Sequence, residues 1–161
     1  MKWIYGKQDF KTLSRGQENC YLLTNGLGGF SSLTMTGSVT RNDHALLMAC
    51  TKAPNHRYNL IHRLKEEIRI GEEKQILSTQ EFADGTKEEG YQHLSAFSFE
   101  DTPVWRWETK GVRIRKEIGM AQLENTVAVV YEMKNQSLFD AELVVTPFLQ
   151  FVRKGEDLTD R

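Results

Sequence analysis

The sequence predicts an all-β fold, an antiparallel β-sandwich, and three observations support this prediction. Apolar and polar residues alternate along several segments, while the 3.6-residue period of an amphipathic helix is scarce. Short turns that contain glycine separate these segments, as in antiparallel hairpins. The 161 residues, 39% of them hydrophobic and 27% charged, suffice to bury the core of one domain. We therefore expect a single β-sandwich domain over residues 1–161.

The alternation is clearest in two segments near the middle of the chain. In 127–133 the odd-numbered residues are apolar or aromatic, and in 112–120 the even-numbered residues are apolar except Lys116. A lysine on an apolar face indicates either an edge position in the sheet or a partner across from it. Residues 110–111, Lys-Gly, follow the predicted strand 104–109, and glycine accepts the positive φ of a tight hairpin.

The remaining segments are predicted from length, breakers and polarity. Residues 141–152 form a long apolar run with Pro147, which predicts an edge strand or a bend because proline cannot donate to a ladder. Residues 60–70 fit both a helix and a strand, and we expect a strand, followed by a turn and a returning strand over 71–77. Residues 82–90 are polar and contain Asp-Gly, which predicts a loop.

Composition and charge exclude several classes of function. The formal net charge is -1, from 21 basic and 22 acidic residues, so the basic excess of a nucleic-acid binder is missing. No apolar run approaches the roughly 20 residues of a membrane span, and the first residues lack a signal peptide. We expect a cytoplasmic protein in which Cys20 and Cys50 are buried and reduced. The histidines lack metal-ligand spacing, so neither a metal nor a cofactor is expected.

The most distinctive segment is the glycine-rich stretch 24–30, TNGLGGF. It lacks the glycine spacing of a dinucleotide fingerprint, and no Lys-Ser/Thr follows as a phosphate loop requires. The next residues, 30–36, fit a strand, so no helix N-terminus would face an anion. The stretch therefore predicts a tight turn between strands 21–23 and 30–36, whose backbone can still approach a sugar.

No complete catalytic constellation is visible. Glycoside hydrolysis generally uses two carboxylates, but the adjacent acids 66–67 would point to opposite faces of a strand. The acidic pairs 72–73 and 88–89 lie in predicted loops, where solvated charge is the ordinary interpretation. His44 precedes the apolar strand 45–50, and a structural role is favoured over acid–base chemistry. We predict no catalytic residue in this chain.

Two tryptophans leave alternatives open. Trp105 and Trp107 share one face of a predicted strand, and Tyr91, Phe97 and Phe99 lie nearby in the sequence. Flat apolar rings suit the C–H faces of sugars, as they suit any apolar partner. Packing in the core is the favoured interpretation, while one exposed ring would be enough for a sugar platform.

An ordered series of segments resembles a known family. Residues 22–30, LLTNGLGGF, are similar to the opening signature of the N-terminal domain of bacterial and archaeal glycogen debranching enzymes (amylo-α-1,6-glucosidases). Residues 40–47, TRNDHALL, resemble the Thr-Arg-Arg-Tyr-His-Gly-Leu-Leu pattern of that family. Further matches follow in the same order as far as Arg153. The chain departs from the pattern at 42, 43 and 45, and again at 153–156, so contacts made there would differ.

The resemblance implies an accessory role. In that family an N-terminal β-sandwich, a supersandwich like those that precede glucoamylase-type barrels, packs against a C-terminal (α/α)6 barrel. That barrel hydrolyses α-1,6-linked glucose at the branch points of trimmed glycogen. The resemblance thus implies that the catalytic acids and the barrel lie outside these residues, and that glycogen or a malto-oligosaccharide is the partner. The residues carried over as a substrate-contact region are Asn25, Gly26, Gly28, Gly29, Arg41 and His44.

Two other functions stay open at this level. The chain fits a stand-alone α-glucan-binding module without catalysis, with Trp105 or Trp107 as its platform. It also fits a purely structural sandwich in which the glycine-rich stretch is only a turn.

Overall fold

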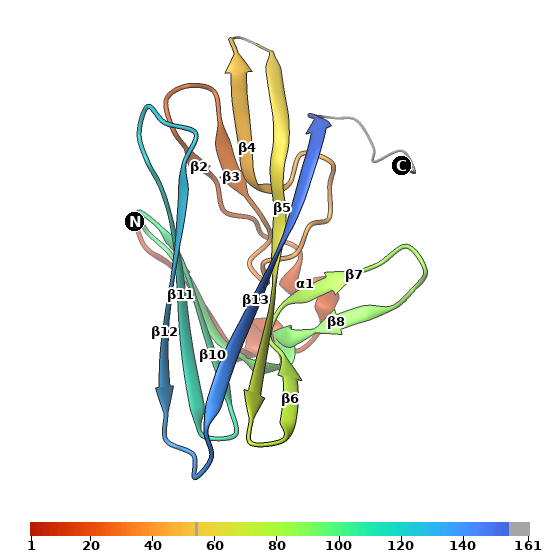
Figure 1. The fold of residues 1–161 in the computed structure, drawn as a ribbon, viewed down its shortest axis with the longest axis vertical. Helices are drawn as coiled ribbons and strands as arrows, with labels where there is room; N and C mark the ends of the chain where they lie inside the picture. Colours follow the sequence, from red (N-terminus) through yellow and green to blue (C-terminus); the bar gives the residue numbers. More distant parts are fainter. Residues whose placement is uncertain (54, 155–161) are drawn as a thin grey trace.

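The structure, a computed structural model, describes residues 1–53 and 55–154, which form two antiparallel sheets along the long axis of the molecule (Figure 1). The first sheet has the strand order β1 (Trp3–Gly6), β9 (Leu94–Phe99), β10 (Pro103–Thr109), β11 (Val112–Met120), β12 (Val127–Asn135). The second has the order β13 (Ala141–Arg153), β5 (His56–Ile70), β4 (Ala45–Lys52), β3 (Phe30–Ser32), β2 (Leu23–Thr24), with β6 (Glu73–Ile76) also paired to β5. The all-β antiparallel prediction is confirmed.

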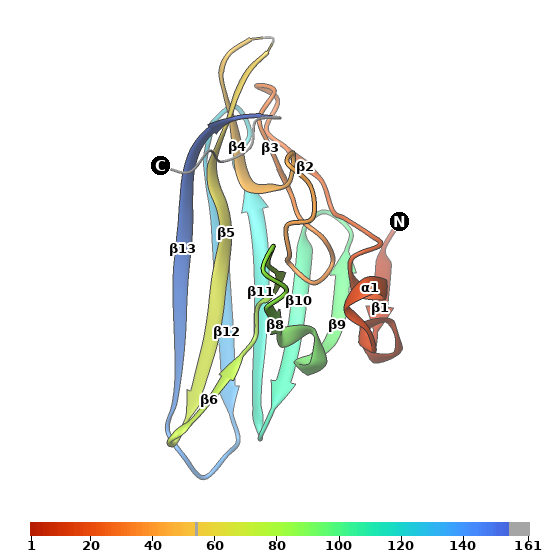
Figure 2. The same cartoon turned by 90° about the vertical axis from the view of Figure 1, so that its right-hand side faces the viewer.

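Smaller elements surround the two sheets. A hairpin of β7 (Thr79–Glu81) and β8 (Lys87–Glu89) projects to one side (Figure 1). Short helices, which the sequence analysis did not predict, are η1 (Lys7–Phe10), α1 (Leu13–Gly16) and η2 (Gly90–His93). Figure 2 shows α1 beside β1, at the opposite side of the molecule from β13. No helix among the described residues is long and apolar enough to cross a membrane.

The core lies between the sheets and is built from the inward faces of the alternating strands. Trp105 is fully buried, and its indole N–H donates to the Met35 carbonyl at 3.0 Å. Tyr21, which lies two residues before β2, meets the Trp105 ring edge-on, with 5.5 Å between ring centroids. The other buried members include Leu33, Leu46, Ile68, Leu77, Leu94, Trp107, Val112, Ile114 and Ile118. The burial of Trp105 and Trp107 confirms that both rings pack in the core, which was the favoured interpretation.

The strands that the sequence predicted around residue 110 are confirmed in detail. Lys110 has φ 47° and Gly111 has φ 82°, the positive values that a tight two-residue hairpin requires. Lys116 is buried at 3% exposure, and its ammonium lies 2.8 Å from Glu66 of β5. Because β11 lies between β10 and β12, the second of the two explanations for this lysine is correct: it has a partner across from it.

The prediction of a strand over 60–70 is also confirmed, because β5 spans His56–Ile70 and returns through β6. β13 lies at the end of its sheet, as Pro147 predicted. The predicted strand 30–36 is shorter than expected, since β3 ends at Ser32 and a loop of mutually bonded hydroxyl groups follows. The charged segment 155–161 of the sequence lies outside the described residues.

The prediction of a solvated loop over 82–90 is wrong in its second half. Residues 87–89 form β8, and Glu88 is 7% exposed. Nη1 and Nη2 of Arg63 donate to the Glu88 carboxylate, at 2.9 and 3.2 Å, and the Ser78 hydroxyl donates to it at 2.9 Å. A buried carboxylate needs such donors. Sequence alternation could not show this, because Arg63 lies on a different sheet, 25 residues away.

Candidate functional site

The glycine-rich stretch is a turn between β2 and β3, and the Asn25 side chain holds its shape. Asn25 is fully buried. Its Oδ1 accepts from the backbone N–H groups of Leu27 and Gly29, at 2.9 and 3.0 Å. Its Nδ2 donates to the Glu124 carbonyl at 2.9 Å and to Asn125 Oδ1 at 3.0 Å. All four contacts are with the protein, so Asn25 positions the turn and has no atom left for a ligand.

The glycines of this turn have different physical roles. Gly26 and Gly28 have φ of 79° and 88°, which strongly favours glycine. Gly29 is buried, and a Cβ there would lie 2.9 Å from the Met48 carbonyl oxygen. The Gly28 carbonyl accepts from Arg57 Nε at 2.6 Å, which joins the turn to β5. The predicted tight turn is therefore confirmed, and a side chain at Gly29 would displace it.

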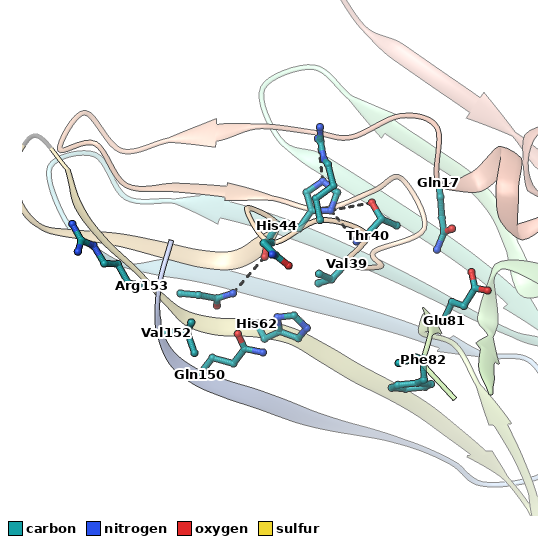
Figure 3. A pocket seen from close by; sticks show the side chains of 14 residues that line it. Gln17, Val39, Thr40, His44, His62, Glu81, Phe82, Gln150, Val152 and Arg153 are labelled. Atoms are coloured by element: carbon teal, nitrogen blue, oxygen red, sulfur yellow. Dashed lines mark hydrogen bonds between the residues drawn. The ribbon is translucent and has the colours of Figure 1, made fainter. Parts of the chain in front are cut away.

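His44 lies immediately before β4 and is held in one orientation. The Thr40 backbone N–H donates to Nδ1 at 3.0 Å (Figure 3). Nδ1 therefore accepts from Thr40, and Nε2 lies 3.3 Å from both Cys20 Sγ and Arg41 Nη2. Burial lowers the pKa of His44, and the nearby Arg41 guanidinium lowers it further, against a smaller opposite effect of Asp43. His44 is thus a neutral, fully engaged ring.

Arg41 and Cys20 complete this group. Arg41 Nη2 lies 3.7 Å from Cys20 Sγ, and the Arg41 side chain is 62% exposed. Burial of the sulfur raises the pKa of Cys20, while Arg41 opposes the effect. Both cysteines are free thiols, but only Cys50 is buried, so the prediction that both are buried is wrong for Cys20. Cys20 lies on the surface because residues 18–20 form an exposed segment after α1.

Two hollows meet at Arg41 and His44. The glycine-loop hollow has a volume of about 670 Å³, and its lining includes Gly26, Gly28, Gly29, Arg57, Asp43 and Lys154 in addition to Arg41 and His44. Residues from the two family-like segments, 22–30 and 40–47, are therefore brought together on one surface. Asn25 lies behind this surface rather than on it.

The β5 hollow lies on the other side of Arg41 and His44 and measures about 660 Å³ (Figure 3). Figure 3 shows His62 and Gln150 along one wall, Val39 and Thr40 opposite, and Glu81 and Phe82 at one end. Gln80 holds that end together, because its side-chain amide donates to the Val39 carbonyl and accepts from the Val39 N–H, each at 2.9 Å.

No sequence feature pointed to Asn59 or Gln150 as site residues, and His62 was weighed only as a metal ligand. These residues come from β5 and β13, which are far apart in the sequence and paired in the sheet. No recognised binding motif includes these residues. The signal that could have raised attention is a run of polar residues inside the apolar alternation of β5.

Neither tryptophan offers a platform to a sugar. Trp105 is fully buried and Trp107 is 2% exposed, and neither lines the glycine-loop hollow or the β5 hollow. The reason is that their strand face points into the core between the two sheets. Within residues 1–53 and 55–154, no cluster of three histidine, cysteine or acidic side chains could hold a metal ion.

The chain matches a known protein family. Residues 19–160 match the family described as glycogen debranching enzyme N terminal. The match begins just before the glycine-rich turn and extends beyond β13. No curated protein and no solved structure matches the chain.

Proposed function

This chain belongs to the glycogen debranching enzyme N-terminal family, and from this premise we propose that it is a non-catalytic accessory domain that positions α-glucan for a separate C-terminal (α/α)6 barrel. The barrel would hydrolyse the α-1,6 branch points of glycogen or of a malto-oligosaccharide in the cytoplasm. The observation that carries the proposal is the glycine-loop hollow, in which family-like residues from two separate segments line one surface.

The chemistry of this hollow suits binding better than hydrolysis. Asp43 is the single acidic side chain among the described residues that line it, whereas glycoside hydrolysis generally needs two carboxylates. Arg41, Arg57 and Lys154 supply N–H donors for sugar hydroxyl groups, and the turn itself exposes backbone at Gly26 and Gly28. A rigid surface of this kind can hold a glucan chain in register, and such orientation assists a reaction catalysed elsewhere.

Rigidity is supported by the contacts behind the hollow. Asn25 joins the turn to residues 124–125, and Arg57 joins it to β5. The His44 ring is fixed by Thr40, so that Arg41 extends from a firmly held segment. A binding surface held in this way loses little conformational entropy when a ligand arrives.

Titration of the 161-residue chain with maltohexaose tests the proposal, followed by calorimetry or by backbone amide shifts in NMR. We expect binding, with amide shifts concentrated in residues 24–30 and an affinity about tenfold lower in Arg41→Ala, the equivalent of about 1.4 kcal/mol. Arg69→Ala is the matched control, because Arg69 is exposed on β5 and lines neither hollow. Absence of binding at millimolar maltohexaose would contradict the proposal.

The accessory role has its own test in the presence of a debranching barrel. Joined to such a barrel, Arg41→Ala is expected to lower kcat/KM for a branched glucan and to leave the hydrolysis of a small α-glucoside unchanged. An equal loss of kcat/KM on both substrates would show that Arg41 supports the fold and does not contact the glucan. The alternative of a stand-alone module with a tryptophan platform loses its basis, since both rings are buried.

A further inference from the structure

Two polar atoms in the wall of the β5 hollow lack a hydrogen-bond partner in the described part of the chain. Asn59 is 5% exposed, and its Nδ2 donates to the His44 carbonyl at 3.4 Å, which identifies the other amide atom, Oδ1, as the acceptor. Within residues 1–53 and 55–154, neither Asn59 Oδ1 nor His62 Nδ1 reaches a partner. Both residues line the same hollow. An unpaired buried polar atom is costly, so two of them beside one cavity indicate a bound group.

An irregularity in β5 brings these two atoms to one hollow. Side chains three positions apart on a regular strand point to opposite faces. In the pairing with β4, however, Met48 lies opposite Asn59 and Leu47 opposite Ile61, which leaves one extra residue on β5. The pairing with β13 shifts in the same region. β-Bulges of this kind redirect side chains and occur often beside functional sites.

The unpaired atoms define what a ligand must offer. Asn59 Oδ1 needs a donor, and His62 Nδ1 donates or accepts according to the tautomer of the ring. Burial lowers the pKa of His62 to about 4, and the nearby Arg63 lowers it in the same direction, so the ring is neutral at pH 7. A hydroxyl group both donates and accepts, and it satisfies either tautomer. Both atoms have less than 1 Å² of exposed surface, so a hydroxyl group meets them only when the Asn59 and His62 side chains turn further toward the hollow.

The rest of the lining favours a neutral ligand with an apolar face. Asn59 Oδ1 needs a donor, which an anion lacks, and a cation would be repelled by Arg41 and Arg153, which outnumber the Glu81 carboxylate in the lining. Phe82 is 40% exposed and presents an aromatic ring to the hollow. Sugar rings combine hydroxyl groups with apolar C–H faces, and aromatic side chains complement such faces.

We propose that the β5 hollow binds a neutral sugar ring, whose hydroxyl groups bond to Asn59 Oδ1 and His62 Nδ1 and whose C–H face lies against Phe82. Arg41 and His44 line both hollows, so this site adjoins the glycine-loop hollow. The choice of glucose as the sugar rests on the proposed function, whereas the site itself rests on Asn59, His62 and Phe82.

The test is a titration of the 15N-labelled 161-residue chain with maltotriose, observed through the side-chain amide of Asn59 and the ring nitrogens of His62. We expect both signals to shift with one common affinity. That affinity is expected to fall about tenfold in Asn59→Ala and in His62→Phe. Asn55→Ala and His56→Phe are matched controls on the same strand hairpin, since both residues are exposed and line neither hollow.

Folding does not obscure the result. His62→Phe removes an unpaired buried atom, so it is expected to melt no lower than the unaltered chain while its affinity for maltotriose falls. If Asn59→Ala fails to fold, the proposal is tested by His62→Phe and by the Asn59 and His62 nitrogen shifts of the unaltered chain. Unchanged Asn59 and His62 signals at millimolar maltotriose would overturn the proposal. If inorganic phosphate shifts the Asn59 and His62 signals and maltotriose does not, the proposal that the ligand is neutral is overturned.

The proposed function can fail separately from this one. Arg57 lines the glycine-loop hollow and is absent from the lining of the β5 hollow. Arg57→Ala is therefore expected to weaken the amide shifts of residues 24–30 and to leave the His62 signals intact. His62→Phe is expected to weaken the shift of the Asn59 side-chain amide and to leave the amide shifts of residues 24–30 intact. If residues 24–30 respond to glucan while Asn59 and His62 do not, the proposed function stands and the β5 site falls.

Discussion

Lys116 and Glu66 form an ion pair inside the sandwich, with 2.8 Å between the ammonium nitrogen and Oε2, and each side chain is 4% exposed. The pair joins β11 of the first sheet to β5 of the second. The Tyr131 hydroxyl donates to the same carboxylate oxygen at 2.8 Å, and the ammonium also lies 5.0 Å from the centre of the Trp105 ring. One carboxylate thus receives two donors in an otherwise apolar core.

Removal of one partner of this pair should be severely destabilising. Lys116→Met leaves the Glu66 carboxylate buried beside apolar groups, and we expect the free energy of unfolding to fall by about 4 kcal/mol. Replacement of both residues, Lys116→Met with Glu66→Leu, should restore most of that loss because no charge is then buried. Urea denaturation measures both. Lys74→Met, at an exposed pair with Glu67, should cost less than about 1 kcal/mol.

The turn held by Asn25 should depend on its side-chain amide. Asn25→Ala removes the acceptor of two backbone N–H groups and the donor of two further bonds, so we expect a loss of about 3 kcal/mol in urea denaturation. Asn55→Ala, at an exposed position, is the control. A loss no greater than that of the control would show that the turn holds its shape without the amide.

Gly29 should tolerate no side chain, because a Cβ there meets the backbone of β4. The distance of 2.9 Å that such a Cβ would have to the Met48 oxygen predicts a loss of about 3 kcal/mol for Gly29→Ala. Gly119→Ala is the matched control, since a Cβ at Gly119 has no neighbour within 4 Å among the described residues. The control is expected to be neutral or slightly stabilising. Thermal unfolding of the two variants side by side would refute the explanation if their midpoints agreed.

Acid should destabilise the chain partly through His62. Its pKa in the folded chain is about 4, below the unfolded value of 6.5, so the unfolded chain binds a proton first as the pH falls. The stabilising contribution is therefore complete above pH 6.5 and is lost as the pH falls from 6.5 towards 4. We expect about 2 kcal/mol over this window, because solvent screens part of the effect at a partly exposed ring.

The comparison of His62→Phe with the unaltered chain isolates this effect. Urea denaturation at pH 7.5 and at pH 4.5 gives the change in stability for each protein. The variant should lose about 2 kcal/mol less than the unaltered chain, since it has no imidazole to protonate. His56→Phe serves as the control, and an equal loss in all three proteins would exclude His62 as the origin.

The strands and hairpins were predictable because their signals are local. Alternation with a period of two identified β11 and β12, and a long apolar run with Pro147 identified β13. Lys110-Gly111 identified the turn between β10 and β11. Glu88 shows the limit of this reasoning. Its burial depends on Arg63 of another sheet, and a polar segment looks solvated until that partner is placed.

The sequence by itself determined the strand content, the glycine-dependent turn and the family-like segments around Asn25 and His44. Only the tertiary structure decided that Asn25 bonds to Asn125, that Lys116 meets Glu66, and that Asn59 and His62 share one hollow. The physical reason is that strand propensity is a property of neighbouring residues. Contacts across 50 or 100 positions depend on strand order, register and bulges, which the packing of the two sheets fixes together.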